Sequence, residues 1–144
     1  MFNGKIALVT GASSGLGRVF ALDCASKGAD VAITARRVDR LETLAQEIRA
    51  MGRRAWVFPC DLSQPGSGAP LCDKLRSEGI EVDILVNNAG LGIHGPWHKQ
   101  NLDDDLRVLR VNVEAVVVLS RILGSGMVER GRGAILNVSS TSAF

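Results

Sequence analysis

Three glycines near the amino terminus have the type and the spacing to bind a phosphate group. They lie in the run Thr10-Gly11-Ala12-Ser13-Ser14-Gly15-Leu16-Gly17, which joins a short apolar segment to an amphipathic one. Gly11 permits a tight turn, Gly15 lets the backbone approach a pyrophosphate closely, and Gly17 lets a helix pack on a sheet. The free N–H groups and the positive dipole end at the start of such a helix favour an anion. The run therefore predicts a nucleotide-binding loop, although any tight strand-to-helix turn uses similar glycines.

Two arginines follow the next apolar run, which ends in Thr34-Ala35-Arg36-Arg37. In a dinucleotide-binding fold, an acidic residue near the end of the second strand binds the ribose 2′-hydroxyl of NAD, whereas an arginine accommodates the 2′-phosphate of NADP. Asp30 lies at the start of that strand, and we expect it in the preceding turn, far from the crevice. Arg36 is positioned for the 2′-phosphate, with Arg37 and Arg18 as sources of further positive potential. A solvated helix start is the alternative, but a helix N-terminus disfavours cations, so we predict NADP (NADPH) rather than NAD.

The elements that must position these groups follow from an alternation of short apolar runs with amphipathic segments. We expect strands at 5–10, 31–35, 55–59, 82–87 and 133–140, and helices at 16–27, 38–51, 71–77 and 102–127. Such an alternation predicts βαβ units with right-handed crossovers and therefore a parallel sheet. The predicted fold is α/β, a Rossmann-type doubly wound sheet in strand order 3-2-1-4-5, with a crevice between strands 1 and 4. Residues 1–144 are long enough for one domain.

Four motifs, by their order and spacing, resemble those of the short-chain dehydrogenases/reductases over the whole chain. They are Thr10 to Gly17, Asp61-Leu62, Asn87-Asn88-Ala89-Gly90 and Asn137-Val138-Ser139-Ser140. The resemblance implies that Asp61 hydrogen-bonds the adenine amino group and that Leu62 flanks the adenine ring. It also implies that Asn88, Ala89 and Gly90 line the ribose of the cofactor. The predicted cofactor-binding residues are Gly11, Ser13, Ser14, Gly15, Leu16, Gly17, Arg36, Arg37, Asp61, Leu62, Asn88, Ala89 and Gly90.

The resemblance also implies a catalytic tetrad of Asn, Ser, Tyr and Lys, of which the sequence supplies two members. Asn112 matches the asparagine that holds the lysine through a water, and we expect its amide to be buried in the long apolar helix. Ser140 matches the serine that holds the substrate oxygen, and Ser139 is expected to be structural. The family's tyrosine lies about a dozen residues after that serine, but this sequence ends at Phe144 and contains no tyrosine. We therefore expect the N-terminal part of a longer reductase, truncated after the fifth strand and severely impaired as a dehydrogenase by itself.

Three functions are compatible with these motifs. The first is the cofactor-binding part of an NADP-dependent oxidoreductase, which reduces a carbonyl or oxidises a secondary alcohol by hydride transfer. The second is a non-catalytic nucleotide-binding module or a regulatory subunit. The third is half of a split enzyme whose tyrosine and lysine come from another chain. The motifs favour the first, with a small-molecule carbonyl or alcohol as the substrate.

Composition excludes other partners and compartments. The net charge of +2 is too small to predict nucleic-acid binding. We expect no membrane span, because charged residues interrupt the longest apolar run, 108–123, well short of roughly 18 apolar residues. Cys24, Cys60 and Cys72 form no C-x-x-C pair and are odd in number, which is typical of reduced thiols in a cytoplasmic protein.

We also expect no metal site. His94 and His98 are the only histidines, and they are separated by four positions. Gly95 and Pro96 lie between them and prevent the helix that would bring the two rings together.

The last two elements predict contact with another chain. The helix expected over 102–127 is apolar on several faces, which is more than contact with a sheet requires. The fifth strand would be an apolar edge, and such edges pair readily with a further strand. Both features are expected where a missing or a partner segment covers them, which agrees with the N-terminal part of a longer reductase. We also expect a homo-oligomer.

Overall fold

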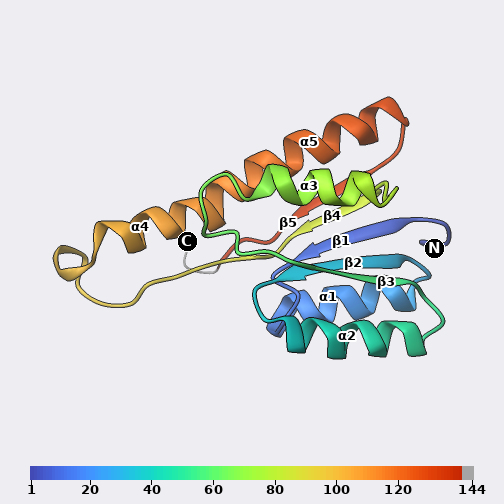
Figure 1. The fold of residues 1–144 in the computed structure, drawn as a ribbon, viewed down its shortest axis with the longest axis horizontal. Helices are drawn as coiled ribbons and strands as arrows, with labels where there is room; N and C mark the ends of the chain where they lie inside the picture. The colour runs from blue at the N-terminus through green and yellow to red at the C-terminus, as the bar shows by residue number, and fades with distance from the viewer. Residues whose placement is uncertain (141–144) are drawn as a thin grey trace.

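A five-stranded parallel sheet forms the centre of the computed structural model, which describes residues 1–140 (Figure 1). The strands are β1 (Ile6–Thr10), β2 (Asp30–Ala35), β3 (Ala55–Pro59), β4 (Ile84–Asn87) and β5 (Ala134–Asn137). Their spatial order is β3-β2-β1-β4-β5, and every neighbouring pair is parallel. This confirms the predicted Rossmann-type sheet and its strand order. The last strand is shorter than predicted, because its pairing with β4 ends at Asn137, and Ser139 and Ser140 lie beyond it.

Helices cover both faces of the sheet (Figure 1). They are α1 (Gly15–Ser26) and α2 (Val38–Ala50) on one face, and α3 (Gly68–Ser77) and α5 (Ala115–Glu129) on the other. The side chains of β1 alternate between two cores, since Ala7 and Val9 pack with α1 and α2, whereas Leu8 packs with α3 and α5. A central parallel strand is thus buried on both sides. This double burial explains why short, continuous apolar runs predicted the strands.

The helical stretch that begins at Leu102 consists of three segments. They are α4 (Leu102–Leu109), a π-helical turn η2 (Arg110–Glu114) and α5. The long helix predicted over 102–127 is therefore close in extent, and the π-helical turn within it was not predicted. Asn101 caps the start, where its Oδ1 accepts a hydrogen bond from the Asp103 N–H at 3.0 Å. Beyond the sheet α4 projects outward, with the 3-10 turn η1 (Trp97–Lys99) near its outer end (Figure 1).

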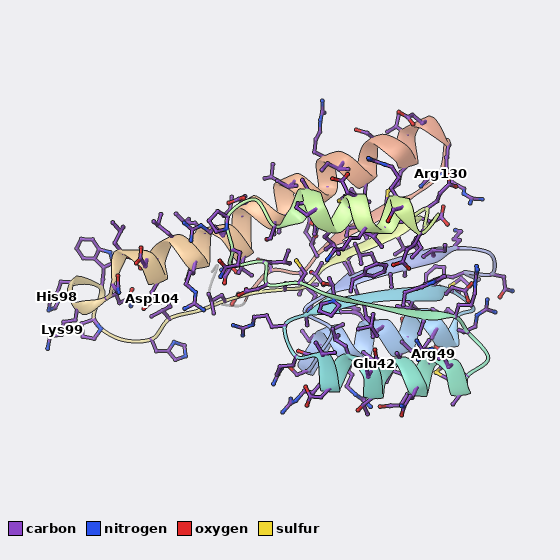
Figure 2. All side chains as sticks on the ribbon, viewed as in Figure 1. Glu42, Arg49, His98, Lys99, Asp104 and Arg130 are labelled. Carbon is purple, nitrogen blue, oxygen red and sulfur yellow. The ribbon has the colours of Figure 1, made fainter. Side chains whose placement is uncertain are left out.

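The histidine region lies far from the sheet. Figure 2 places His98 and Lys99 at the outer end of α4. Both histidines are exposed. Within residues 1–140, no group of three or more His, Cys, Asp or Glu side chains is suited to hold a metal ion.

By length and composition alone, the stretch Leu102–Glu129 could cross a membrane. It has 28 residues and a mean hydropathy of 1.5 over its most apolar window. The prediction that no segment is long and apolar enough is wrong by this measure, since few charges interrupt that window. Core helices have the same composition, and Leu119 and Met127 pack here into the core between α3 and the sheet. One such helix is weak support for a membrane span.

Candidate cofactor site

A cavity of about 350 Å³ lies at the carboxyl ends of β1, β2, β3 and β4. Doubly wound sheets bind their ligands at this edge. The cavity brings together ten of the thirteen predicted cofactor residues from four separate parts of the sequence. These ten are Gly11, Ser13, Ser14, Arg36, Arg37, Asp61, Leu62, Asn88, Ala89 and Gly90. The other three, Gly15, Leu16 and Gly17, lie outside the lining, and Leu16 is 60% exposed.

The three glycines of the phosphate loop have different surroundings, two of them packed closely and one open. A Cβ on Gly11 would lie 2.8 Å from the Ala89 Cα, so this glycine lets the loop touch the end of β4. A Cβ on Gly17 would lie 2.3 Å from the Gly11 carbonyl oxygen and 2.4 Å from the Asn88 Nδ2. Gly15 has a φ of +55° and open space in front of it. The loop is thus packed tightly behind and open at Gly15, which suits the approach of a phosphate to its backbone.

Thr10 joins this loop to β4, a role that the sequence analysis missed. Its Oγ1 accepts hydrogen bonds from the backbone N–H groups of Asn88 (3.0 Å) and Ala89 (2.9 Å). The Asn88 Nδ2 donates to the carbonyl oxygens of Thr10 (3.1 Å) and Gly11 (3.3 Å). The amide nitrogen of Asn88 therefore holds the loop and does not face a ligand. A polar residue that ends a buried strand directly before Gly11 was the available signal.

The two arginines after β2 have different surroundings. Arg37 Nη2 donates to the Ser13 Oγ at 3.0 Å and to the Ser14 Oγ at 2.9 Å. This pairing ties the end of β2 to the phosphate loop. Arg36 is exposed and makes no hydrogen bond with a residue of the described range 1–140. Its guanidinium is close enough to Asp61 to contribute to lowering the pKa of that carboxyl group. Arg36 thus presents a cation to the cavity with its donors available.

Arg18 and Asp30 lie outside the cavity. Arg18 donates to the Glu47 Oε2 of α2 at 2.5 Å, so its charge is paired. Asp30 lies at the opposite end of the sheet from the cavity, as predicted, but it is the first residue of β2 and not part of the preceding turn as expected. It is buried there and accepts hydrogen bonds from Arg53 and Arg54. Asp30 is therefore a structural anion and does not bind the ribose.

Asp61 is held in place by the loop that follows β3. Its Oδ1 accepts from the Ser63 N–H at 3.0 Å and from the Ser63 Oγ at 2.7 Å. Its Oδ2 accepts from the Gln64 Nε2 at 3.4 Å. Desolvation raises the pKa of Asp61, but these hydrogen bonds and the charge of Arg36 outweigh it and lower the pKa overall. The side chain is therefore a carboxylate at neutral pH and can accept a hydrogen bond from an amino group.

Six further residues line the cavity that the site prediction did not include, namely Thr34, Ala35, Cys60, Ser63, Leu91 and Val111. Leu91 and Val111 provide an apolar wall with Leu62, and Val111 and Leu62 belong to one small core cluster. Thr34 is buried, and its Oγ1 has no hydrogen-bond partner among the described residues. Cys60 is a neutral thiol, because burial and the charge of Asp61 raise its pKa. An open glycine backbone, an unpartnered hydroxyl, a free arginine and an apolar wall together suit a phosphorylated dinucleotide.

The two predicted catalytic residues do not line this cavity. Asn112 lies in the π-helical turn and is exposed, so the prediction of a buried amide is wrong, because α4 and η2 extend past the sheet that would cover them. Its amide instead clamps the segment after β4. The Oδ1 accepts from the Leu91 N–H at 2.9 Å, and the Nδ2 donates to the Leu91 carbonyl at 2.8 Å. Ser140 is exposed and lies three residues past the end of β5.

The fold and the site together define a class of protein. A parallel sheet in this order, with helices on both faces and a glycine-rich loop at the crevice, is the Rossmann-type fold of dinucleotide-binding proteins. The family model described as short chain dehydrogenase matches residues 5–144. The chain belongs to the short chain dehydrogenase family.

Individual relatives agree with this assignment. A short chain dehydrogenase of Pseudocercospora fijiensis is 42% identical over 142 residues, which cover 97% of this chain and 46% of the relative. A metagenomic short-chain oxidoreductase solved in complex with NADP has a TM-score of 0.89 and 38% identity, covering 96% of this chain and 63% of the other. L-Sorbose reductase from Gluconobacter frateurii, solved with NADPH and L-sorbose, has a TM-score of 0.91 and 35% identity, covering 99% and 54%. The chain spans about half the length of the curated relatives it matches.

Proposed function

We propose that these residues form the cofactor-binding part of an NADP-dependent oxidoreductase that acts on a small-molecule carbonyl or secondary alcohol. The observation that carries the proposal is the cavity, because it gathers residues predicted from four distant motifs at one edge of the sheet. The choice of cofactor is supported by the NADP and NADPH bound in the two solved relatives. It is supported in this chain by Arg36, whose donors have no partner in the described residues.

Different residues would bind different parts of the cofactor. The start of α1 and the open backbone at Gly15 would hold the pyrophosphate. Arg36 would pair with the 2′-phosphate, beside the Arg37 side chain that braces the loop serines. Asp61 and Leu62 would hold the adenine, the first as a hydrogen-bond acceptor and the second as an apolar surface. NADPH, when bound, supplies the hydride.

The catalytic roles of Ser140 and Asn112 are part of the same proposal. The Ser140 hydroxyl would hold the substrate oxygen. Asn112 would keep Leu91, and with it one wall of the cavity, in position through its two hydrogen bonds. Proton transfer needs a group that the 144 residues do not supply at the family's position, because the sequence has no tyrosine. We propose that the working enzyme includes such a group, and that it is a cytoplasmic homo-oligomer.

Two other functions are compatible with the same cavity. A nucleotide-binding module or regulatory subunit needs the cavity but no general acid. Half of a split enzyme would need the same cavity and a partner chain that supplies tyrosine and lysine. NADPH oxidation with a panel of ketones separates these from an active reductase. Binding without turnover favours the module, and turnover restored by a second chain favours the split enzyme.

Arg36→Ala tests the cofactor assignment. We expect calorimetric titration of the 144-residue protein to give micromolar binding of NADPH and much weaker binding of NADH. Loss of a charge-assisted contact to the 2′-phosphate should weaken NADPH binding about 10- to 100-fold and leave NADH almost unchanged.

Arg40→Ala is the matched control for that variant. Arg40 is exposed on α2, does not line the cavity and carries the same charge, so its loss should change NADPH affinity less than about twofold. Equal losses in the two variants would assign the effect to overall charge. A folded wild-type protein that binds neither nucleotide would contradict the proposed function.

A further inference from the structure

The loop after β3 is joined to the long helix by one side-chain hydrogen bond that the cofactor motifs do not include. The Gly66 N–H donates to the Glu114 Oε1 at 2.9 Å, across 48 positions of sequence. Within residues 1–140, no other hydrogen bond links residues 60–67 to the helical stretch from Leu102 to Glu129. Gly66 has a φ of +66°, a conformation that glycine adopts without strain. Glu114 therefore holds the tip of this loop.

From Ser67, the residue that follows Gly66, a series of hydrogen bonds leads to the wall of the cavity. The Ser67 N–H donates to the Gln64 carbonyl at 3.3 Å, and the Gln64 N–H donates to the Asp61 carbonyl at 3.1 Å. The Gln64 Nε2 also contacts the Asp61 carboxylate, which Ser63 binds from the other side. A displacement of the tip would therefore reach Asp61 within one turn of the loop.

The π-helical turn that contains Glu114 contacts two loops that contribute residues to the cavity. Residues two apart on a helix point to nearly opposite sides. Accordingly, Asn112 reaches the segment after β4 through Leu91, and Glu114 reaches the loop after β3 through Gly66. Val111, between these directions, lines the cavity itself. The turn thus connects the two loops that flank the predicted adenine and ribose positions.

We propose that Glu114 is a positioning residue that fixes the adenine end of the cofactor cavity by anchoring the loop after β3 to the π-helical turn. This inference rests on the proposed function, because it assigns that loop to the adenine end of a bound NADPH. Glu114 itself does not line the cavity, so it acts through Gly66 and Gln64 on Asp61.

Three variants of the full chain test this role. Glu114→Ala removes the acceptor, Glu114→Gln keeps an acceptor oxygen, and Glu129→Ala removes an exposed glutamate from the same helical stretch. Each is titrated with NADPH and with 2′,5′-ADP, which carries only the adenine half of the cofactor. Amide hydrogen exchange at Gly66 is followed without nucleotide. Thermal unfolding checks that every variant is folded.

We expect Glu114→Ala to weaken both ligands about 3- to 10-fold and to speed exchange at Gly66, because one charge-assisted hydrogen bond is lost. Glu114→Gln and Glu129→Ala should stay within about twofold of wild type. Unchanged 2′,5′-ADP affinity in Glu114→Ala, or the same loss in Glu129→Ala, would overturn the inference while leaving the proposed function intact. Wild-type protein that binds neither ligand would refute the proposed function, and with it the role of Glu114 in positioning the adenine end of the cavity. Amide exchange at Gly66 would still show in that case whether Glu114 anchors the loop.

Discussion

Gly17 shows how a single missing methyl group shapes the cofactor site. It is buried in the first turn of α1, against Gly11 and Asn88, the residues that directly follow β1 and β4. Its neighbours are the Gly11 carbonyl and the Asn88 amide, and the Asn88 amide is itself held by two hydrogen bonds. Neither neighbour is the free end of a flexible side chain. Glycine is therefore required here for close packing, not for an unusual backbone angle.

Gly17→Ala should destabilise the protein by about 1–3 kcal/mol, because the new Cβ would overlap backbone that cannot move without disturbing the loop. It should also weaken NADPH binding, because the new Cβ would displace Asn88 and with it the phosphate loop. Chemical denaturation and calorimetry measure the two effects. Gly92→Ala is the control, since a Cβ there would meet nothing within 4 Å and φ is not positive. Equal stability of the two variants would contradict the packing argument.

At the scale of elements, β5 is the least protected strand of the described sheet. It is the last strand in the order β3-β2-β1-β4-β5, and all four of its residues are exposed. Ile135 and Leu136 are 42% and 44% exposed. An edge strand with open backbone donors and apolar side chains is prone to pair with another strand. The neighbouring helix α5 adds exposed apolar residues, among them Val117 and Val128.

Ile135→Lys should reduce self-association of the 144-residue protein, because a charge on the edge opposes strand pairing. Sedimentation velocity over a range of concentrations should show a mean mass that rises with concentration in the wild type and rises less in the variant. Val38→Lys, at an exposed apolar position of α2, is the control for the added charge. A wild-type protein with the same mass at every concentration would rule the prediction out.

At the scale of the whole molecule, the two ends of the sheet have different tasks. The carboxyl end carries the cavity, and the amino end carries two buried carboxylates that pair with partly exposed arginines. Asp30 accepts from the backbone and side chain of Arg54 and from Arg53, and Asp83 accepts from Arg132 and from the Ile6 N–H. These contacts join β1, β2 and β4 with the segments that lead into β3 and β5. Two separate groups of contacts at the amino end thus hold β2 beside the start of β3, and β1 beside the starts of β4 and β5.

Asp30→Asn should therefore cost about 1–3 kcal/mol of unfolding free energy at pH 7. Desolvation raises the pKa of Asp30, but the hydrogen bonds and charges of Arg54 and Arg53 outweigh it and lower the pKa below the ordinary 3.8. A lowered folded-state pKa stabilises the fold above the ordinary pKa, and this contribution is lost as pH falls through the folded-state value. The difference between wild type and Asp30→Asn should accordingly shrink below about pH 4.

Urea denaturation at several pH values measures this dependence. Asp73→Asn is the matched control, because Asp73 pairs with Arg76 at the surface, where both side chains are more than 70% exposed. Its stability should stay within about 0.5 kcal/mol of wild type across the range. A difference for Asp30→Asn that persists unchanged at low pH would contradict the linkage.

The amino-acid sequence by itself determined the sheet and the place of the cofactor loop. Strands that are buried on both faces consist of short apolar runs. A turn such as the one at Gly11 needs a residue that tolerates positive φ. These features depend on near neighbours along the chain. They therefore survive in a linear pattern, and the strand order follows from the rules of parallel connections.

Side-chain partners were decided only by the tertiary structure. Arg18, Arg36 and Arg37 look alike in the sequence, yet one pairs with Glu47, one is free for a ligand, and one holds the loop serines. Asn112 was expected to be buried and is exposed. Such outcomes depend on groups tens of residues away approaching within about 3 Å, the range of a hydrogen bond, and on where a helix leaves the sheet. The local periodicity of the sequence predicts neither the long-range hydrogen bonds nor the point where a helix leaves the sheet. The contacts around the cavity are therefore seen only in the folded chain.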